Sequence, residues 1–501
     1  MKRNIVANIT GSLWGFLLSL AAIPLQIRLL GAEAYGLIGF ITSLQLILVV
    51  LDFGLSTSVV REIAADNSNT RQAGREVAQV GATVYWAVAL IVGAILFLAA
   101  DPIARRWLIV ESLTPEYTAA AVRIMAVYLT FTWTIGHYAN VLFGLNRLDI
   151  VNGLKIALAT LSQGGAIVLL LVIPDLHALL AWLAFAALVG AAVHLFAVRR
   201  LFPGFSVRPY WSRAVIRRIR RVSFDMNLVS TASVIVSQAD KLLISLLLPL
   251  SLLGYYNVAT KLMLGVALIP SAIASSALPS LTTKYAAGQI QALKLQYDRM
   301  AQLVLYLIAG ATFGLVFFGG DVLRLWTSDA AALHAERALG LLVIGNMLNA
   351  VTQMTYALMI ATDHTRELRR IYVSAVPVYL ALLYVLTNAV GIEGAALAFG
   401  AYSLYLIGTM LVYAQRRVFG ESVVVWLNRA LTPFALIGAG VFAVCRAVVD
   451  LAGWRDGWLW IAALGGAAYL LIGFLFLHAD TRASIIDVSR IALIRLRRHG
   501  V

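Results

Sequence analysis

Charged residues are scarce in this 501-residue sequence, where they make up 13% of the chain, against about 25% in an ordinary soluble domain. One cysteine is present, Cys445, so the chain cannot form an internal disulfide. The seven histidines are scattered and show none of the paired spacing that metal ligands usually have. No stretch has the composition of a soluble catalytic domain. We therefore predict a protein that is not an enzyme and that holds no metal or cofactor.

Apolar residues make up 61% of the chain and recur in continuous runs. A membrane-crossing helix needs about 20 such residues, and continuous rather than alternating runs favour helices over strands. The first run is too long for a cleaved signal peptide and lacks a small-residue cleavage site. We predict an all-α integral membrane protein with about 14 transmembrane helices, placed at 9–30, 36–57, 81–100, 119–142, 156–174, 177–198, 224–248, 254–279, 301–319, 338–360, 371–390, 393–414, 430–449 and 457–478.

Basic residues are distributed unequally between the two sides of these spans. With the N-terminus inside, the cytoplasmic loops and tails hold 29 of the Lys and Arg residues and the outer loops hold five. This bias predicts that both termini lie in the cytoplasm. The segment 199–221 carries eight arginines, which we expect to lie against anionic membrane lipids rather than to bind nucleic acid. Segments 61–80, 280–300 and 481–499 resemble amphipathic helices at the same interface.

The chain repeats itself at an offset of about 217–220 residues. Six spans per repeat give both halves the same orientation, as in transporters whose substrate path lies between two parallel repeats. We predict an N-terminal six-helix bundle with a basic loop at 1–221, a C-terminal six-helix bundle at 222–420, and two extra helices with a basic tail at 421–501. The matching segments are 29–36 with 247–254, 101–107 with 321–326, and 199–200 with 416–417.

Polar residues recur at helical spacing in four spans that form two equivalent pairs in the repeat. Steps of three, four or seven residues place each set on one helix face. Amide and hydroxyl groups suit the hydrogen bonds of a sugar, although small polar residues also join membrane helices to one another. We predict that these faces line a substrate path. The sets include Asn8, Ser12 and Ser19; Asn227, Ser230 and Ser237; Thr130 and Thr134; and Asn346, Asn349 and Gln353.

The cations within the spans include Arg28, Arg123, Lys241 and Lys261. A charge at the bilayer centre costs about 2.5–3.5 kcal/mol on insertion scales, so it usually faces water, a partner or a ligand. Because these cations outnumber the acids there, we predict that they bind an anionic substrate, and both residue types suit pyrophosphate oxygens. The alternatives are that Lys261 pairs with Asp240 for stability, and that the arginines extend to the membrane surface.

Asp52, Asp240 and His137 are the candidates for ion coupling, through a proton or a sodium gradient. Asp52 could instead cap a helix end or pair with Arg61. A histidine titrates near neutral pH, but His137 could equally be a hydrogen-bonded contact between helices. Both alternatives remain open at the level of sequence.

The ordered set of motifs resembles the polysaccharide-transport branch (O-antigen flippase, Wzx-type) of the multidrug/oligosaccharidyl-lipid/polysaccharide exporter superfamily. The resemblance implies two six-helix bundles in a V shape with two extra helices. It also implies transfer of a polyprenyl-pyrophosphate-linked oligosaccharide from the cytoplasmic to the periplasmic leaflet. The motifs are RLLGAEAYG at 28–36, LDFGLS at 51–56, DKLLI at 240–244, GYY at 254–256, LPSL at 278–281 and GIEGAALA at 391–398.

Two other functions compete with a flippase. Multidrug members of the superfamily often use an acid in the first span for ion coupling, and residues 9–30 contain none. A polysaccharide polymerase or glycosyltransferase usually needs a large loop or an acidic site, and neither is apparent. A polymerase is instead a candidate partner of a flippase. The sugar, the type of glycan, the coupling ion and the oligomeric state are not indicated.

Overall fold

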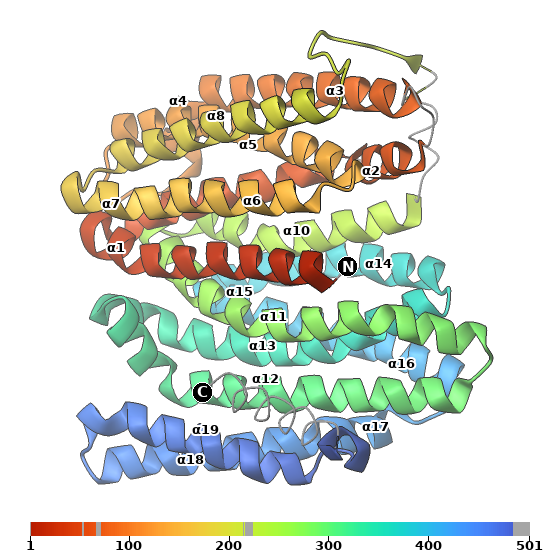
Figure 1. Cartoon of the computed structure of the whole chain (residues 1–501). Coiled ribbons are helices and arrows are strands. Elements are labelled where there is room, and N and C mark those ends of the chain that lie inside the picture. Colours follow the sequence, from red (N-terminus) through yellow and green to blue (C-terminus); the bar gives the residue numbers. More distant parts are fainter. Residues whose placement is uncertain (1, 53–54, 67–71, 214, 216–223, 484–501) are drawn as a thin grey trace, which may run out of the picture. The chain divides into compact units, whose positions relative to one another are not determined.

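The computed structural model describes residues 2–52, 55–66, 72–213, 215 and 224–483, and helices make up nearly all of this part of the chain (Figure 1). Short segments of 3-10 or π-helix, labelled η, interrupt or extend the α-helices. The first half contains α1 (Lys2–Leu48), η1 (Val49–Asp52), α2 (Leu55–Ala65), α3 (Gln72–Leu98), α4 (Ala100–Pro102), η2 (Ile103–Trp107), α5 (Pro115–Gly144), α6 (Leu148–Ala159), η3 (Thr160–Gly164), α7 (Gly165–Val172), α8 (Leu176–Leu201) and α10 (Phe224–Leu247).

The second half is also made of helices. It contains α11 (Leu250–Ala286), α12 (Ile290–Trp326), α13 (Asp329–Ala361), α14 (Thr365–Val390), α15 (Ile392–Leu406), η4 (Ile407–Leu411), α16 (Val412–Ala414), η5 (Gln415–Phe419), α17 (Val423–Ala430), α18 (Thr432–Leu451), η6 (Arg455–Gly457) and α19 (Trp458–Leu475). Between described residues, the one strand-like pairing is an isolated backbone bridge of Ile109 with Pro249.

Thirteen helices in the described residues are long and apolar enough to cross a membrane. The first, Leu13–Asp52, has 40 residues. At 1.5 Å per residue it is about twice as long as the hydrocarbon core is thick. It bends at Gly31, whose backbone angles (φ 86°, ψ 164°) are not helical, so it forms two spans. The chain is therefore an all-α integral membrane protein, and about 14 spans are consistent with these helices.

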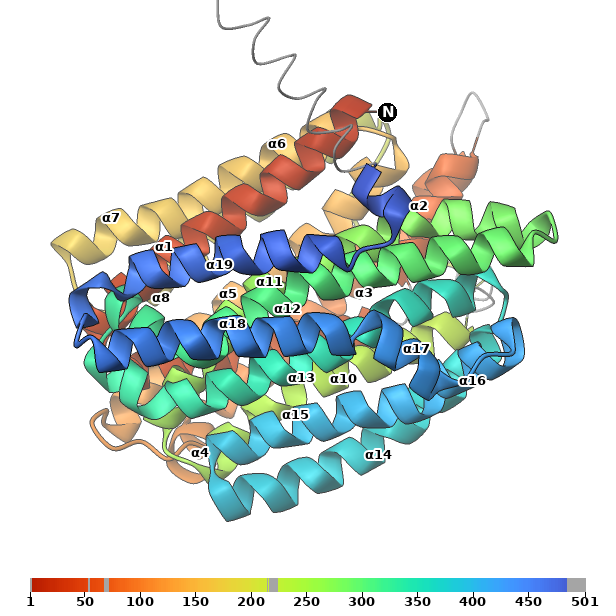
Figure 2. The ribbon, with the colours of Figure 1, turned by 90° about the horizontal axis from the view of Figure 1, so that it is seen from below.

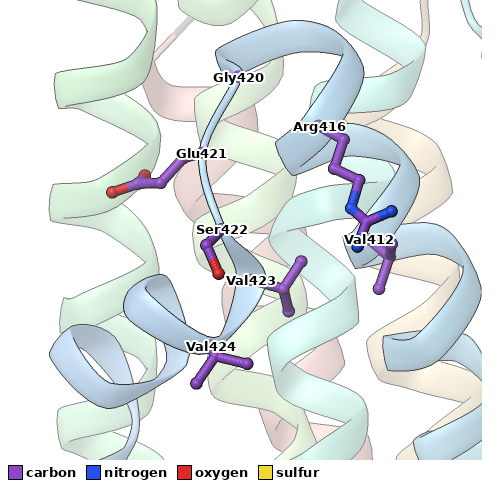
Figure 3. Close-up of a pocket in the computed structure, with 7 residues that line it drawn as sticks. All are labelled: Val412, Arg416, Gly420, Glu421, Ser422, Val423 and Val424. Carbon is purple, nitrogen blue, oxygen red and sulfur yellow. The ribbon is translucent and has the colours of Figure 1, made fainter.

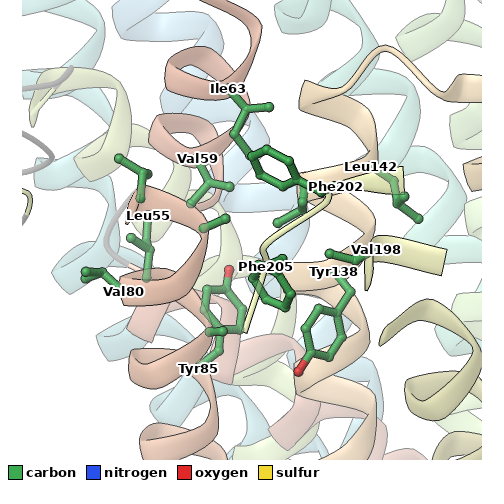
Figure 4. Packing of buried hydrophobic residues seen from close by; sticks show 14 of the residues in the cluster. Leu55, Val59, Ile63, Val80, Tyr85, Tyr138, Leu142, Val198, Phe202 and Phe205 are labelled. Carbon is green, nitrogen blue, oxygen red and sulfur yellow. The ribbon is translucent and has the colours of Figure 1, made fainter. Parts of the chain in front are cut away.

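The chain forms two compact units, one of Met1–Asn257 with Trp326–Ser328 and one of Val258–Leu325 with Asp329–Val501. In the first unit α5 packs against α3 and α8, and α1 packs against α6 and α10. Tyr85, Tyr138, Phe202 and Phe205 join aliphatic side chains of α2, α3, α5 and α8 in one buried cluster (Figure 4). The repeat boundaries at 221 and 420 remain predictions.

In the second unit α15 packs against α13 and α14, and the C-terminal pair α18 and α19 pack against each other (Figure 2). Two tyrosines tie α19 to α12, since Tyr306 Oη donates to Leu470 O at 2.7 Å and Tyr469 Oη donates to Tyr306 O at 2.6 Å. The segment 280–300 is not a separate interfacial helix. It consists of the continuous ends of α11 and α12, joined by a turn at Gly288.

Candidate functional site

Asp240 and Lys241 form the best-defined charged cluster within a span of the first unit. Lys241 Nζ lies 3.3 Å from Asp240 Oδ1 and donates to Ser237 O at 2.9 Å. The other oxygen of Asp240 accepts from Tyr256 Oη on α11 at 2.8 Å. Both charged side chains are close to 90% buried. Asp240 thus binds its neighbour in sequence and a tyrosine, and the ammonium of Lys241 has an internal counter-ion.

The two predicted arginines of the first unit have different partners. Arg28 Nε donates to the backbone carbonyl of Thr327 at 2.7 Å, a neutral acceptor. Arg123 on α5 pairs with Asp101 of α4 and lies over the ring of Phe97 at 6.0 Å. Asp101 therefore offsets part of the positive charge that the sequence places in the spans.

Asp52 occupies the position of a helix cap. Its carboxylate accepts from the backbone N–H of Ser56 at 3.2 Å and from Ser56 Oγ at 2.7 Å, in the first turn of α2. Tyr85 Oη on α3 donates to its other oxygen. The hydrogen bonds with Ser56 agree with the capping alternative.

His137 lies fully buried between α5 and α3. Its Nε2 is 3.0 Å from the carbonyl oxygen of Ala78 and so carries the proton that is donated. Its ring is 5.0 Å from that of Tyr85, and a Cβ on Gly81 would lie 2.5 Å from its Cε1. These contacts agree with a hydrogen-bonded contact between helices.

The remaining described candidates belong to the second unit. Lys261 is half-buried on α11. On α13, Gln353 Nε2 donates to Asn349 Oδ1 at 3.4 Å, so these two residues share a helix face, as predicted. Asn346 is 5% exposed, and its Nδ2 has no acceptor among the described residues. Asn8 and Asn227 lie outside the residues whose side chains the structure describes.

The second unit also contains a pocket of about 460 Å³ where η5 ends and α17 begins (Figure 3). Arg416, Glu421 and Ser422 line it with three valines and Gly420. None of the predicted substrate-binding residues lines it. Glu421 already binds Lys294 at 2.9 Å. Among described residues, no three His, Cys, Asp or Glu side chains gather as a metal site would require.

Three residues that complete these clusters were not among the predicted site residues. Tyr85 and Tyr256 lie in apolar runs where a tyrosine looks like ordinary core, and Asp101 was assigned to a loop. Asp101 did carry a signal, because it was one of the repeat matches. The two tyrosines could not be predicted from spacing, because the way the helices cross decides that Tyr85 donates to Asp52 and Tyr256 donates to Asp240.

The sequence and the fold are both similar to known membrane proteins. A relative named "Putative O-antigen transporter", from Shigella flexneri, is 22% identical over 396 residues, which covers 79% of this chain and 93% of that protein. The described fold is similar to a structure of the lipid II flippase MurJ in an inward closed conformation. The TM-score is 0.69 with 14% identity, and the match covers 97% of this chain and 100% of that one.

An inward-facing multidrug resistance transporter of the MATE family, in the MOP superfamily, has a TM-score of 0.65 with 15% identity, covering 83% of this chain and 96% of that one. At such identities the two structures show the fold alone. The polysaccharide biosynthesis protein family matches residues 1–283, more than half of the 501-residue chain. The chain is therefore a many-span membrane protein that belongs to the polysaccharide biosynthesis protein family.

Proposed function

We propose that the protein flips a polyprenyl-pyrophosphate-linked oligosaccharide from the cytoplasmic to the periplasmic leaflet of the bacterial inner membrane, by alternating access. The observation that carries the proposal is a flippase-like fold with cations inside its spans. Arg28, Arg123, Lys241 and Lys261 would bind the pyrophosphate, and the amides of α13 would bind sugar hydroxyls. The protein would act as a transporter and not as an enzyme, with both termini in the cytoplasm.

The Asp240–Lys241 pair suggests how cargo and ion could be exchanged. An anionic head group that approaches Lys241 competes with Asp240 for the same ammonium, 3.3 Å away. Once released, the buried carboxylate of Asp240 lacks its counter-ion, and the coupling cation would replace it. Tyr256 holds the carboxylate in place for the return step. We propose this exchange as the route of coupling.

The test of the proposed function is a deletion in the host, followed by labelling of lipid-linked oligosaccharide on each leaflet with a membrane-impermeant sugar-directed probe. We expect build-up on the inner leaflet and loss of surface glycan. Lys241→Ala should reproduce the deletion with normal protein in the membrane, whereas Lys284→Ala, at the end of α11, should complement it. Normal glycan in the Lys241 variant would remove that residue from the site.

A cation-coupled multidrug antiporter is the second candidate, favoured by the similarity to the MATE transporter. It predicts unchanged lipid-linked pools in the deletion strain and drug resistance on overexpression. In that case Asp52 and Asp240 are the residues to change first. The two functions therefore differ in the outcome of one labelling experiment.

A further inference from the structure

Two glycines at matching positions of the predicted repeat bring α1 into backbone contact with the start of α11, within the first unit. Gly36 lies near the start of the second span, after the bend in α1, and Gly254 lies one turn into α11. A Cβ on Gly36 would lie 2.0 Å from the carbonyl oxygen of Leu250. A Cβ on Gly254 would lie 2.0 Å from the carbonyl oxygen of Ala32. Each glycine thus faces the carbonyl four residues before the other.

We call this reciprocal crossing the glycine seam, and it consists of Ala32, Gly36, Leu250 and Gly254. At each of the two glycine positions there is space for a hydrogen atom but not for a Cβ. Backbone carbonyls cannot move aside as a flexible side chain can, so even alanine at either glycine would separate the helices. Small residues of this kind let membrane helices pack closely. The side chains of Leu37 and Leu253, which lie beside the seam, are both fully buried.

One loop crosses over the seam and holds both of its helices. The buried carboxylate of Glu33 accepts the backbone N–H groups of Glu111 and Ser112, at 2.5 and 2.8 Å. Ser251, the repeat equivalent of Glu33, donates to Glu111 Oε2 at 3.1 Å. Leu250 N also donates to Ile109 O at 2.9 Å. The charge pattern of the loops places this loop and the seam on the outer side of the membrane.

A buried polar group opposes the closed seam. Asn257, the repeat equivalent of Gly39, occupies the space that the missing side chain of Gly39 leaves: a Cβ there would lie 1.8 Å from its Nδ2. Asn257 is 5% exposed, and no acceptor among the described residues reaches its Nδ2. Such an amide gains a partner only when the helices part and water or cargo enters.

We propose that the glycine seam is the outer closure of the transport path, and that it opens and closes as a unit during the cycle. The inference rests on the proposed function for its role in transport, but the opening itself can be measured without knowing the cargo. Tight backbone packing stabilises the closed state, and the unsatisfied amide of Asn257 destabilises it. Opposing contributions of this kind keep two states close in free energy.

The test uses a cysteine-free background, obtained by Cys445→Ser, with one reporter, Leu253→Cys, labelled in intact cells by a membrane-impermeant thiol reagent. We expect a several-fold rise in labelling for Gly36→Ala and for Gly254→Ala. Gly136→Ala is the matched control, because a Cβ added there would have no neighbour within 4 Å, and should leave labelling unchanged. Unchanged labelling in both seam variants would overturn the proposal, and so would a rise seen only in inverted vesicles.

Asn257→Leu provides a second variant in case a glycine variant does not reach the membrane. Leucine has nearly the same shape and no amide, so it should stabilise the closed seam and lower reporter labelling below that of the parent. Equal or increased labelling would count against the seam. If labelling responds as expected but the deletion leaves lipid-linked oligosaccharide on both leaflets unchanged, the seam stands and the proposed flippase function fails.

Discussion

An aspartate that lies three or four residues after a phenylalanine, at one end of a span, binds an arginine in each half of the chain. In the first half, Asp101 follows Phe97, and Arg123 lies over the ring and pairs with the acid. In the second half, the guanidinium of Arg446 lies 5.9 Å from the ring of Phe318 and its Nη1 lies 2.7 Å from Asp321.

The arginines come from different places in the chain. Arg123 belongs to α5, inside the repeat, whereas Arg446 belongs to α18, one of the two helices outside it. The residue 220 positions after Arg123 is Val343, which is fully buried. The helix α18 therefore supplies a cation to Asp321 that position 343 does not. The comparison shows how a helix outside the predicted repeat can dock on the second unit through an ion pair with an acid at the end of a span.

The largest expected effect is that of Asp321→Ala. Asp321 is 17% exposed and accepts from both Arg446 and Arg324. Its loss removes one of the two acidic partners of each arginine, while Asp450 and Asp329 remain. We expect the free energy of unfolding to fall by about 1–3 kcal/mol. Asp101→Ala is the matched control. Its carboxylate is 49% exposed, so it should cost only about 0–1 kcal/mol. Thermal unfolding in detergent measures both, and a larger loss for Asp101→Ala would contradict the comparison.

A smaller effect is expected for the coupling between the two members of each pair. Changing Arg446 and Asp321 to alanine singly and together should reveal an interaction free energy of about 0.5–3 kcal/mol. The same cycle on Arg123 and Asp101 should give a smaller value, because both side chains are more exposed. Equal coupling energies in the two cycles would mean that burial does not distinguish the pairs.

The smallest effect is expected at Asp329, which binds the same Arg324 from the surface. Its side chain is 89% exposed, so water replaces the ion pair at little cost. Asp329→Asn should change the free energy of unfolding by less than about 0.5 kcal/mol. A loss as large as that of Asp321→Ala would show that the ion pairs of Arg324 and Arg446 with Asp321 and Asp329 act cooperatively, and that the pair with Arg446 does not dominate.

The spans could be predicted because they depend on composition and spacing along the chain, whereas the repeat stays a prediction. Even so, the segment 280–300 was read as separate because its polarity resembles that of a surface helix, while its backbone simply continues α11 and α12. Hydropathy reports where a helix leaves the hydrocarbon, and it does not report where the helix ends.

Side-chain partners were harder to predict, since they depend on how helices cross. Asp240 binds Lys241 and Tyr256, partners that its spacing along the sequence did not indicate. Gly36 and Gly254 were seen as repeat matches, yet their mutual contact requires the helices to be placed to within an ångström. Sequence spacing identifies which residues share a face, and the register of the facing helix decides what they touch.

Gly31 and Gly36 stand five residues apart and would behave differently in a scan of all substitutions. Gly31 has space around it, but its φ of 86° with ψ of 164° is a conformation that is essentially confined to glycine. Every replacement there should fail to a similar degree, whatever its size. At Gly36 the backbone is helical and the space is absent, so tolerance should fall with side-chain volume. The shape of the two substitution profiles would separate conformational from steric selection within a single helix.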